Sequence, residues 1–203
     1  LHSQRGELGP YMTAKRQRRQ TAPEDFTISR QVGETRQSKA CRAPFGYYGA
    51  KQRLARRIIG ELPPHNAWVE AFCGSAALTL AKSPAPIEII NDLDDQIVNL
   101  FEQIRTNAKA LCEAVALTPY ARAEFQGARE MRIVDNPLER ARRFLVATMM
   151  TVNGTSGSPR CGFSFSQSYA REGREARVNR WYNLPSRLQT VVERLRSIRV
   201  EKR

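Results

Sequence analysis

In the middle of the chain, short apolar runs typical of strands alternate with segments whose apolar residues have helical spacing. Residues 67–72 (AWVEAF) form a short apolar run typical of a buried strand, and residues 86–92 (PIEIIND) form a second. The segments after each run, residues 74–82 and 94–117, carry apolar side chains at helical intervals. A strand–helix–strand–helix order predicts a parallel sheet covered by helices, which is an α/β fold.

A helical pattern precedes this region. Residues 51–64 place Leu54, Ile58 and Leu62 four positions apart, with arginines on the other side. The pattern ends at a Pro-Pro pair, and proline cannot continue a helix because it lacks the backbone N–H. We therefore predict a helix of about three turns with these three side chains on its buried face.

The second half of the chain predicts helices around a polar loop. A helix is expected from Asn136, a cap residue followed by proline, to the Asn153-Gly154 pair, which suits a helix end. Residues 153–183 are rich in glycine, serine and polar residues, which predicts a long loop or a small hairpin. Residues 185–198 predict a last helix, and the final IRVEK predicts the start of a third strand.

The charge balance indicates the kind of partner. The chain has 33 Lys and Arg against 20 Asp and Glu, a net charge of +13 at pH 7. Most of the positive residues are arginines, which form forked hydrogen bonds with phosphates and guanine edges. We expect a nucleic acid as the partner. A solvated basic surface without a partner would give the same composition.

Composition also bears on location and on metals. No apolar run is long enough to cross a bilayer, and the N-terminus lacks the apolar segment of a signal peptide, so we expect a cytoplasmic protein without a membrane partner. The four cysteines form no CxxC pair and the chain has two histidines, so the usual zinc-ligand spacings are absent. We expect free thiols and no metal site.

The corner between the first predicted strand and its helix reads VEAFCGSAA. In an open parallel sheet, ligands bind beyond the C-terminal ends of the strands. Gly74 would let the backbone approach a ligand there, and the helix that follows directs free N–H groups at the same place. The corner lacks the G-x-G-x-x-G and G-K-[ST] patterns of dinucleotide sites and P-loops.

The second predicted strand ends at Asp92. In nucleotide-binding parallel sheets an acid about 20 residues after the glycine turn accepts hydrogen bonds from two ribose hydroxyls, and Asp92 lies close to that interval after Gly74. The alternative role for Asp92 is to cap the next helix, which Asp94 or Asp95 can do equally well.

A third segment, APFGYYGAKQRLARRI, puts an aromatic pair, a glycine turn and a lysine directly before a helix. As part of a pocket, Tyr47 would pack on a flat ring and Lys51 would reach a carboxylate. The alternative is a hydrophobic staple followed by a charged first turn.

Together these segments resemble the Dam-type family of DNA adenine-N6 methyltransferases. In that family a segment like F-x-Y-x-G-x-K precedes an F-x-G-x-x-A corner, matched here by residues 45–51 and 72–77. The acidic strand end of the family is matched by residues 91–94. Residues 181–195 (W-Y-N-L-P-x-R-L-x-x-V-x-x-R-L) also resemble a phage-type member, and the resemblance covers roughly residues 44–203.

This resemblance implies a Rossmann-like fold that binds S-adenosylmethionine and transfers its methyl group to N6 of an adenine flipped out of its partner, double-stranded DNA. It also implies roles for five residues. Tyr47 and Lys51 would contact the methionine end of the cofactor, Phe72 and Gly74 would form its floor, and Asp92 would hold the ribose. No metal is implied.

The family's catalytic motif does not occur in this sequence. That motif, D-P-P-Y, accepts hydrogen bonds from the adenine amino group, and neither it nor N-P-P-Y or S-P-P-Y is present, so no catalytic residue is assigned. Three explanations stay open: a truncation, one half of a split enzyme, or a protein that binds DNA and cofactor without methylating. An incomplete sheet would leave an apolar edge that a second polypeptide or another copy of the chain would cover.

The segment after the predicted 136–154 helix is the expected DNA-facing region. Arg171, Arg174, Arg177 and Arg180 recur every three residues, which on a helix gives a basic stripe suited to phosphates. A solvated face would show the same pattern. Arg160, in the loop, would reach a guanine edge in a bidentate contact.

These expectations divide the chain into four parts: a disordered basic arm at 1–43, a cofactor-binding α/β part at 44–118, an inserted helical and hairpin target-recognition region at 119–185, and a helix with the start of a third strand at 186–203. The predicted function is a site-specific adenine methyltransferase that needs a further C-terminal part for catalysis. The alternative is a non-catalytic DNA-binding or regulatory subunit, and cofactor binding distinguishes the two.

Overall fold

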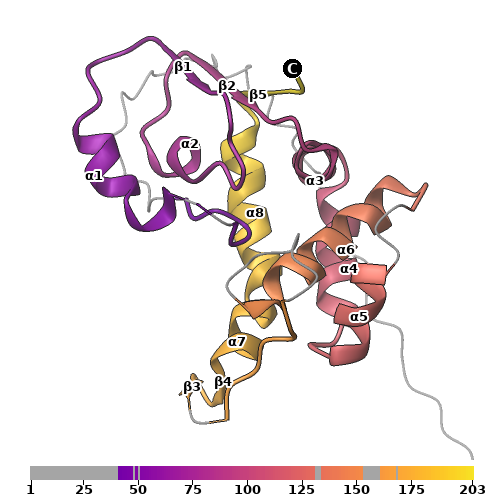
Figure 1. Cartoon of the computed structure of the whole chain (residues 1–203). Coiled ribbons are helices and arrows are strands. Elements are labelled where there is room, and N and C mark those ends of the chain that lie inside the picture. Colours follow the sequence, from indigo (N-terminus) through magenta and orange to yellow (C-terminus); the bar gives the residue numbers. More distant parts are fainter. Residues whose placement is uncertain (1–40, 48, 50, 131–133, 153–160, 168) are drawn as a thin grey trace, which may run out of the picture. The chain divides into compact units, whose positions relative to one another are not determined.

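The computed structural model describes residues 41–47, 49, 51–130, 134–152, 161–167 and 169–203. Its main sheet is parallel, with the strand order β1–β2–β5 (Figure 1). The strands are β1 (Ala67–Glu70), β2 (Ile87–Asn91) and β5 (Ile198–Glu201). The predicted strands, their parallel arrangement and the α/β class are confirmed.

Helices account for most of the other described residues, with one short antiparallel hairpin. The helical elements are η1 (Lys51–Arg53), α1 (Ala55–Gly60), α2 (Ala77–Ala81), α3 (Asp95–Thr106), α4 (Ala108–Leu117), α5 (Arg122–Glu130), α6 (Pro137–Met149), α7 (Ala176–Tyr182) and α8 (Leu184–Leu195). The hairpin consists of β3 (Ala170–Arg171) and β4 (Arg174–Glu175), within the segment for which a loop or hairpin is predicted.

Helices α2, α3 and α8 lie against one face of the main sheet. Successive right-handed crossovers that move in one direction across a parallel sheet place α2, α3 and α8 on the same side. On that side Ile90 is fully buried, whereas Val69 and Ile87 on the other side are each 57% exposed. Parallel sheets are normally covered on both faces. The exposed apolar surface therefore lies on the face of β1 and β2 rather than along the edge strand β5, whose outward residues Arg199 and Glu201 are charged.

One hydrophobic core joins the sheet to the helices. Phe101 of α3, Leu145 of α6 and Leu188 of α8 are at most 1% exposed and belong to the same cluster. Cys41 and Ala43, at the end of the predicted basic arm, are also buried in it. The cofactor-binding and recognition parts of the sequence-based division thus share a core over the described residues.

Two helices begin at the predicted caps. The Asp94 carboxylate accepts a hydrogen bond from the Gln96 N–H at 2.9 Å and caps α3. The Asn136 side chain accepts from the N–H groups of the second and third residues of α6, at 2.9 and 3.1 Å, with proline as the first residue. These bonds satisfy N–H groups that lack a partner inside the helix.

The single helix predicted over residues 94–117 is wrong, because α3 and α4 are separated at Asn107. This residue leaves helical geometry, with φ −129° and ψ 33°, and its side chain donates to the Gln103 side chain at 2.7 Å. The Thr106 hydroxyl donates to the Glu102 carbonyl at 2.7 Å. Side chains of this kind compete with helical backbone hydrogen bonds, so an apolar pattern that continues across them does not keep one helix intact.

The helix predicted over residues 51–64 is shorter than expected, since η1 and α1 end by Gly60. Of the three side chains on its predicted buried face, Ile58 and Leu62 are half-buried, whereas Leu54 is 56% exposed. Helices α5 and α7 are absent from the sequence-based prediction. Both are dominated by charged and polar residues, so their apolar spacing is too sparse to predict them.

Charged side chains at the start of α6 hold it against α5. Glu139 accepts from Arg142 in a forked pair with both N···O distances 2.7 Å, and it also pairs with Arg143. Arg142 reaches on to Glu124 of α5 at 3.0 Å. The hydrogen bonds from Arg142 lower the pKa of Glu139 to about 2, and those from Arg143 add to this despite burial.

Replacing Glu139 with glutamine is expected to lower the free energy of unfolding at pH 7 by about 1–2 kcal/mol. Because the folded-state pKa lies below the unfolded one, the ionised carboxylate stabilises the protein above about pH 4.5, and this contribution is lost as the pH falls toward about 2. Urea unfolding at several pH values should therefore show a weaker acid dependence in the variant. Glu193→Gln, whose side chain is 72% exposed, is the matched control, and equal acid dependence in the two variants would contradict this assignment.

Candidate functional site

A pocket of about 240 Å³ opens at the C-terminal ends of β1 and β2. All five residues predicted to bind a cofactor line it: Tyr47, Lys51, Phe72, Gly74 and Asp92. The other lining residues are Gly49, Glu70, Cys73, Ser75 and Ala77. The structure therefore brings together three segments that the sequence places apart, at the end of the sheet where parallel strands bind ligands.

Gly74 and Tyr47 form one wall of the pocket in close contact. Gly74 has φ +50°, a backbone conformation that glycine adopts without a steric penalty. A Cβ atom added there would lie 3.0 Å from Cδ1 of the Tyr47 ring. Tyr47 also meets Phe45 edge-on, with ring centroids 6.1 Å apart, and Phe45 belongs to the core. The aromatic wall is thus fixed from behind by the core and approaches the glycine backbone directly.

Asp92 fastens the corner from the second strand. One carboxylate oxygen accepts from the Gly74 N–H at 2.8 Å and the other accepts from the Asp94 N–H at 3.1 Å. The cap of α3 is supplied by Asp94, so the alternative role considered for Asp92 is filled by its neighbour. Asp92 lines the pocket while it holds the glycine turn in place.

Phe72 and Lys51 lie on the open side of the pocket. The Phe72 side chain is 76% exposed, which leaves an apolar ring next to the turn without a protein partner covering it in the described structure. Lys51 is exposed at the start of η1 and forms no ion pair with a described residue. An apolar rim and a lysine at the mouth suit a ligand with an apolar portion and an anionic end.

Glu70 and Ser75 are pocket residues that the sequence analysis missed. Glu70 is 7% exposed, and its Oε2 accepts from the Thr79 N–H at 3.0 Å and from the Thr79 hydroxyl at 2.5 Å. Burial raises the pKa of Glu70, although the bonds from Thr79 and the charge of Lys51 oppose this. The signal was its position at the end of the first strand, where the argument used for Asp92 applies equally.

The Ser75 hydroxyl is buried and has no hydrogen-bond partner among the described residues. Such an orphaned polar atom costs free energy unless a partner is supplied. Since Ser75 lines the pocket, a polar group of a bound ligand is a suitable partner.

Ionisation in the pocket argues against nucleophilic chemistry by its own side chains. Burial raises the pKa of the Cys73 thiol, and the nearby charges of Asp92 and Glu70 raise it further. Burial also raises the pKa of Tyr47, with added contributions from Asp94 and Asp92. Both groups stay neutral near pH 7, and a neutral thiol is a poor nucleophile. The pocket therefore binds and orients a ligand, and its own side chains do not act as nucleophiles.

The residues present fit a nucleoside with a charged tail. A carboxylate suits ribose hydroxyls, an aromatic wall suits a flat or apolar portion, and a lysine with an unpartnered hydroxyl suits a polar end. Within the described part of the chain no three metal-ligating side chains come together.

The arginines predicted to read DNA do not form one helical stripe. Arg171 lies in β3 and Arg174 in β4, and only Arg177 and Arg180 lie on α7, so the single-helix arrangement is wrong. The chain reverses direction between the first pair at Gly173, whose φ is +72°, which places a turn inside the arginine repeat. Arg174 stacks on the Tyr182 ring, 4.1 Å from its centroid. Arg160 falls outside the described residues.

Comparison with protein families decides the assignment. The D12 class N6 adenine-specific DNA methyltransferase family matches residues 47–190. The chain belongs to this family. A comparison with curated proteins gave no match. The match begins at Tyr47 and includes every other predicted cofactor residue, and the predicted adenine-N6 DNA methyltransferase family is confirmed.

Membership implies that this chain is a DNA adenine-N6 methyltransferase that uses S-adenosylmethionine and acts on DNA. It also implies that the small parallel sheet belongs to a Rossmann-like methyltransferase fold. Among the described helices of this methyltransferase, none has the length and apolar character needed to cross a membrane.

Proposed function

We propose that this chain is the cofactor-binding and DNA-recognition part of a cytoplasmic, site-specific adenine methyltransferase, and that the β1–β2 pocket is its S-adenosylmethionine site. The observation that carries the proposal is that five residues chosen from separate motifs line a single pocket. They come from three segments of the chain, and the pocket lies at the end of the sheet where parallel folds bind nucleotides.

Each residue has a role that its position supports. Asp92 accepts hydrogen bonds from the ribose hydroxyls while it keeps its bonds to the Gly74 and Asp94 N–H groups. Phe72 and Gly74 form the floor. Tyr47 and Lys51 contact the methionine end, with the lysine opposite the carboxylate. Ser75 supplies the additional hydrogen-bonding group that the sequence analysis missed.

The cofactor supplies an activated methyl group, and the chain contributes by orientation and electrostatics. The pocket holds the methyl donor at the strand ends, and the DNA-binding residues hold the duplex so that a flipped adenine reaches it. Arg171, Arg174, Arg177 and Arg180 are the DNA contacts we propose among the described residues. The target sequence is set by contacts beyond this set.

We further propose that catalysis requires a D-P-P-Y-type segment that these 203 residues lack, supplied by a continuation of the chain or by a second polypeptide. The exposed apolar face formed by Val69 and Ile87 supports this, since a parallel sheet is normally covered on both faces. Phe72, which lines the pocket, is a further exposed apolar side chain.

Replacing Asp92 with alanine is expected to weaken S-adenosylmethionine binding about 10- to 100-fold, because two charge-assisted hydrogen bonds to the ribose are lost. Calorimetric titration of the purified chain and of the variant measures this. Circular dichroism checks that the fold is kept, since Asp92 also fastens Gly74.

Asp95→Ala is the matched control, because this neighbouring aspartate is 67% exposed and pairs with Lys202 instead of lining the pocket. It should bind the cofactor as the unmodified chain does. Unchanged affinity in Asp92→Ala would reject the pocket assignment. Absence of cofactor binding by the unmodified, folded chain would favour the alternative of a non-catalytic DNA-binding or regulatory subunit.

A further inference from the structure

Four arginines near the junction of α7 and α8 interact through their charges. Arg180 interacts in this way with Arg177, and Arg187 interacts with Arg180 and with Arg42, which precedes Tyr47 in the chain. Arg177 and Arg180 are three residues apart on α7, and so lie on one side of that helix. Helical hydrogen bonds continue through the junction, from the Asn183 N–H to the Asn179 carbonyl and from the Arg187 N–H to the Asn183 carbonyl. Arg187, seven residues after Arg180, therefore lies on the same side.

The cluster reaches the cofactor pocket through Gly46. One terminal nitrogen of Arg180 lies 3.0 Å from the position that a Cβ on Gly46 would take. Gly46 directly precedes Tyr47, which forms the aromatic wall of the pocket. The guanidinium thus packs against the backbone next to the residue that would contact the cofactor.

No acidic side chain among the described residues forms an ion pair with these arginines. Within the described part of the chain none of the four forms an ion pair, although Arg177, Arg180 and Arg187 are partly buried. Burial and the charge of Arg177 lower the pKa of Arg180, and burial with the charges of Arg180 and Arg42 lowers the pKa of Arg187. The phenol of Tyr120 is the group that partly offsets this at Arg180.

Like charges held together in partly buried positions cost free energy that an anion recovers. Guanidinium groups from three segments can hold one tetrahedral anion in several forked hydrogen bonds, which is how arginine binds phosphate.

We propose that Arg42, Arg177, Arg180 and Arg187 form a binding site for a backbone phosphate of the DNA, next to the pocket wall at Gly46 and Tyr47. This inference rests on the proposed function, in which the chain holds DNA beside the cofactor. It adds Arg42 and Arg187 to the DNA contacts and separates Arg177 and Arg180 from the hairpin arginines. A phosphate bound here sets the distance between the DNA strand and the cofactor. The site therefore positions the target nucleotide but does not recognise its base.

The test is the salt dependence of duplex binding by the full chain and by Arg180→Gln and Arg187→Gln. Fluorescence anisotropy with a labelled duplex of about 20 base pairs is measured over a range of NaCl concentrations. Each variant should bind about tenfold more weakly, and its slope of log K against log salt should be smaller by about 0.9, the value for one phosphate contact. Arg196→Gln removes the same charge from a side chain that is 75% exposed and paired with Glu193, and should keep the slope.

Thermal melting separates this role from a structural one. Removal of one of several repelling cations should leave the melting temperature unchanged or raise it, whereas a structural role predicts a lower melting temperature with an unchanged salt slope. An unmodified chain that does not bind the duplex at low salt, or cluster variants with the slope of Arg196→Gln, would overturn the proposal.

Inorganic phosphate is the second probe. If it raises the melting temperature of the unmodified chain but not of Arg187→Gln, while the duplex slopes are equal, the site holds free phosphate and the DNA assignment is rejected. Titration with S-adenosylmethionine keeps the two proposals apart. If the cluster variants show a reduced slope but the unmodified chain binds no cofactor, the phosphate site is supported and the cofactor assignment is rejected. If the unmodified chain binds the cofactor but the variants keep its slope, only the phosphate site is rejected.

Discussion

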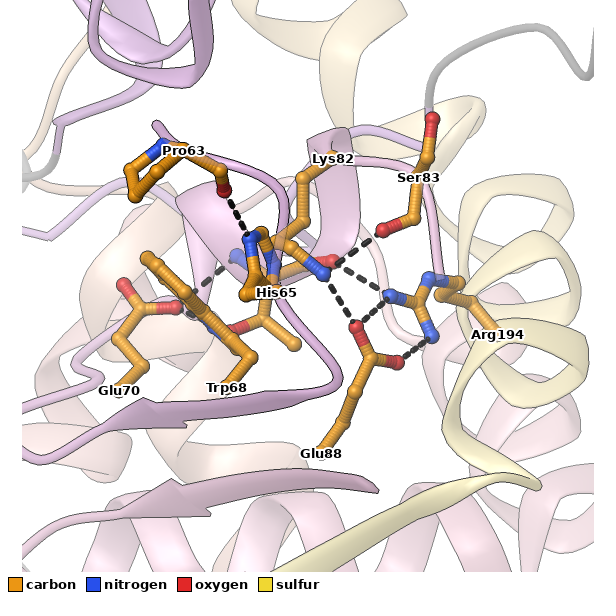
Figure 2. Close-up of polar contacts among 9 residues, drawn as sticks. Pro63, His65, Trp68, Glu70, Lys82, Ser83, Glu88 and Arg194 are labelled. Carbon is orange, nitrogen blue, oxygen red and sulfur yellow. Dashed lines mark hydrogen bonds and ion pairs between the residues drawn. The ribbon is translucent and has the colours of Figure 1, made fainter. Parts of the chain in front are cut away.

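Replacing Glu88 with alanine is expected to lower the free energy of unfolding by about 3–5 kcal/mol, because it leaves two buried cations without a negative charge to pair with. The Glu88 side chain is fully buried in β2, and Lys82 and Arg194 are 2% and 11% exposed. Figure 2 shows Glu88 between them, with the lysine ammonium 2.7 Å from one carboxylate oxygen and the guanidinium within 2.8 Å of both. A single-domain protein has a total stability of about 5–15 kcal/mol, so this loss is a large share of it.

Further contacts keep both cations, Lys82 and Arg194, in their buried positions. Lys82 also donates to the Ser83 carbonyl at 2.7 Å and lies over the Trp68 ring, 5.4 Å from its centroid. Arg194 donates to the Thr79 carbonyl at 2.9 Å, so α8 is tied to α2 as well as to β2. Burial alone would raise the pKa of Glu88, but hydrogen bonds from Arg194 and Lys82 outweigh it and hold the pKa below its usual value.

Urea unfolding followed by circular dichroism measures the effect, with Glu193→Ala as the control because that side chain is 72% exposed. A triple variant, Lys82→Met with Glu88→Leu and Arg194→Met, should recover most of the loss, since an apolar replacement of a whole buried ion network is often neutral. A loss below about 1 kcal/mol in Glu88→Ala, the size typical of an exposed pair, would contradict the network's stabilising role. Equal losses in the single and triple variants would indicate that shape, rather than unpaired charge, is the cause.

The sequence predicts the pocket well because its parts are local signals. The turn at Gly74, the acid at Asp92 and the Tyr47–Lys51 segment each have a short pattern with a physical reason, and parallel strands bring their ends together. The apolar run continues to Phe72, so the sequence places Glu70 inside the strand, whereas β1 ends at Glu70. Ser75 could not be found from a pattern, since its unpartnered hydroxyl is a property of the packed corner.

Sequence patterns do not predict ion pairs between distant residues or helices with few apolar positions. The Glu88–Arg194 pair joins residues 106 positions apart, and a glutamate within PIEII gives no sign of which cation it meets. Helix α7 has few apolar positions, so its existence depends on tertiary contacts such as the buried Trp181, whose indole N–H donates to the Thr118 carbonyl at 2.8 Å. The arginine spacing is regular, but Gly173 turns the chain within it and divides the arginines between a hairpin and a helix.

Replacing Gly74 with alanine is expected to weaken S-adenosylmethionine binding by more than about 100-fold, through the backbone and the pocket wall together. Alanine at φ +50° is strained by about 1–2 kcal/mol. Its Cβ would meet the Tyr47 ring at 3.0 Å, and that ring is backed by Phe45 of the core. A shift of the turn would also weaken the bond from the Gly74 N–H to Asp92. Calorimetric titration with S-adenosylmethionine and urea unfolding measure affinity and stability.

Gly127→Ala is the matched control, because a Cβ at this position in α5 meets nothing within 4 Å. It should bind the cofactor normally and gain about 0.5–1 kcal/mol of stability from the better helix former. A double-mutant cycle between Gly74→Ala and Tyr47→Ala then separates the two causes. If the contact with the ring dominates, the stability losses are less than additive, because removing the ring makes room for the new methyl group. If strain at φ +50° dominates, the two stability losses add. Unchanged cofactor affinity in Gly74→Ala would show that the pocket wall formed by Gly74 and Tyr47 is not part of the binding site.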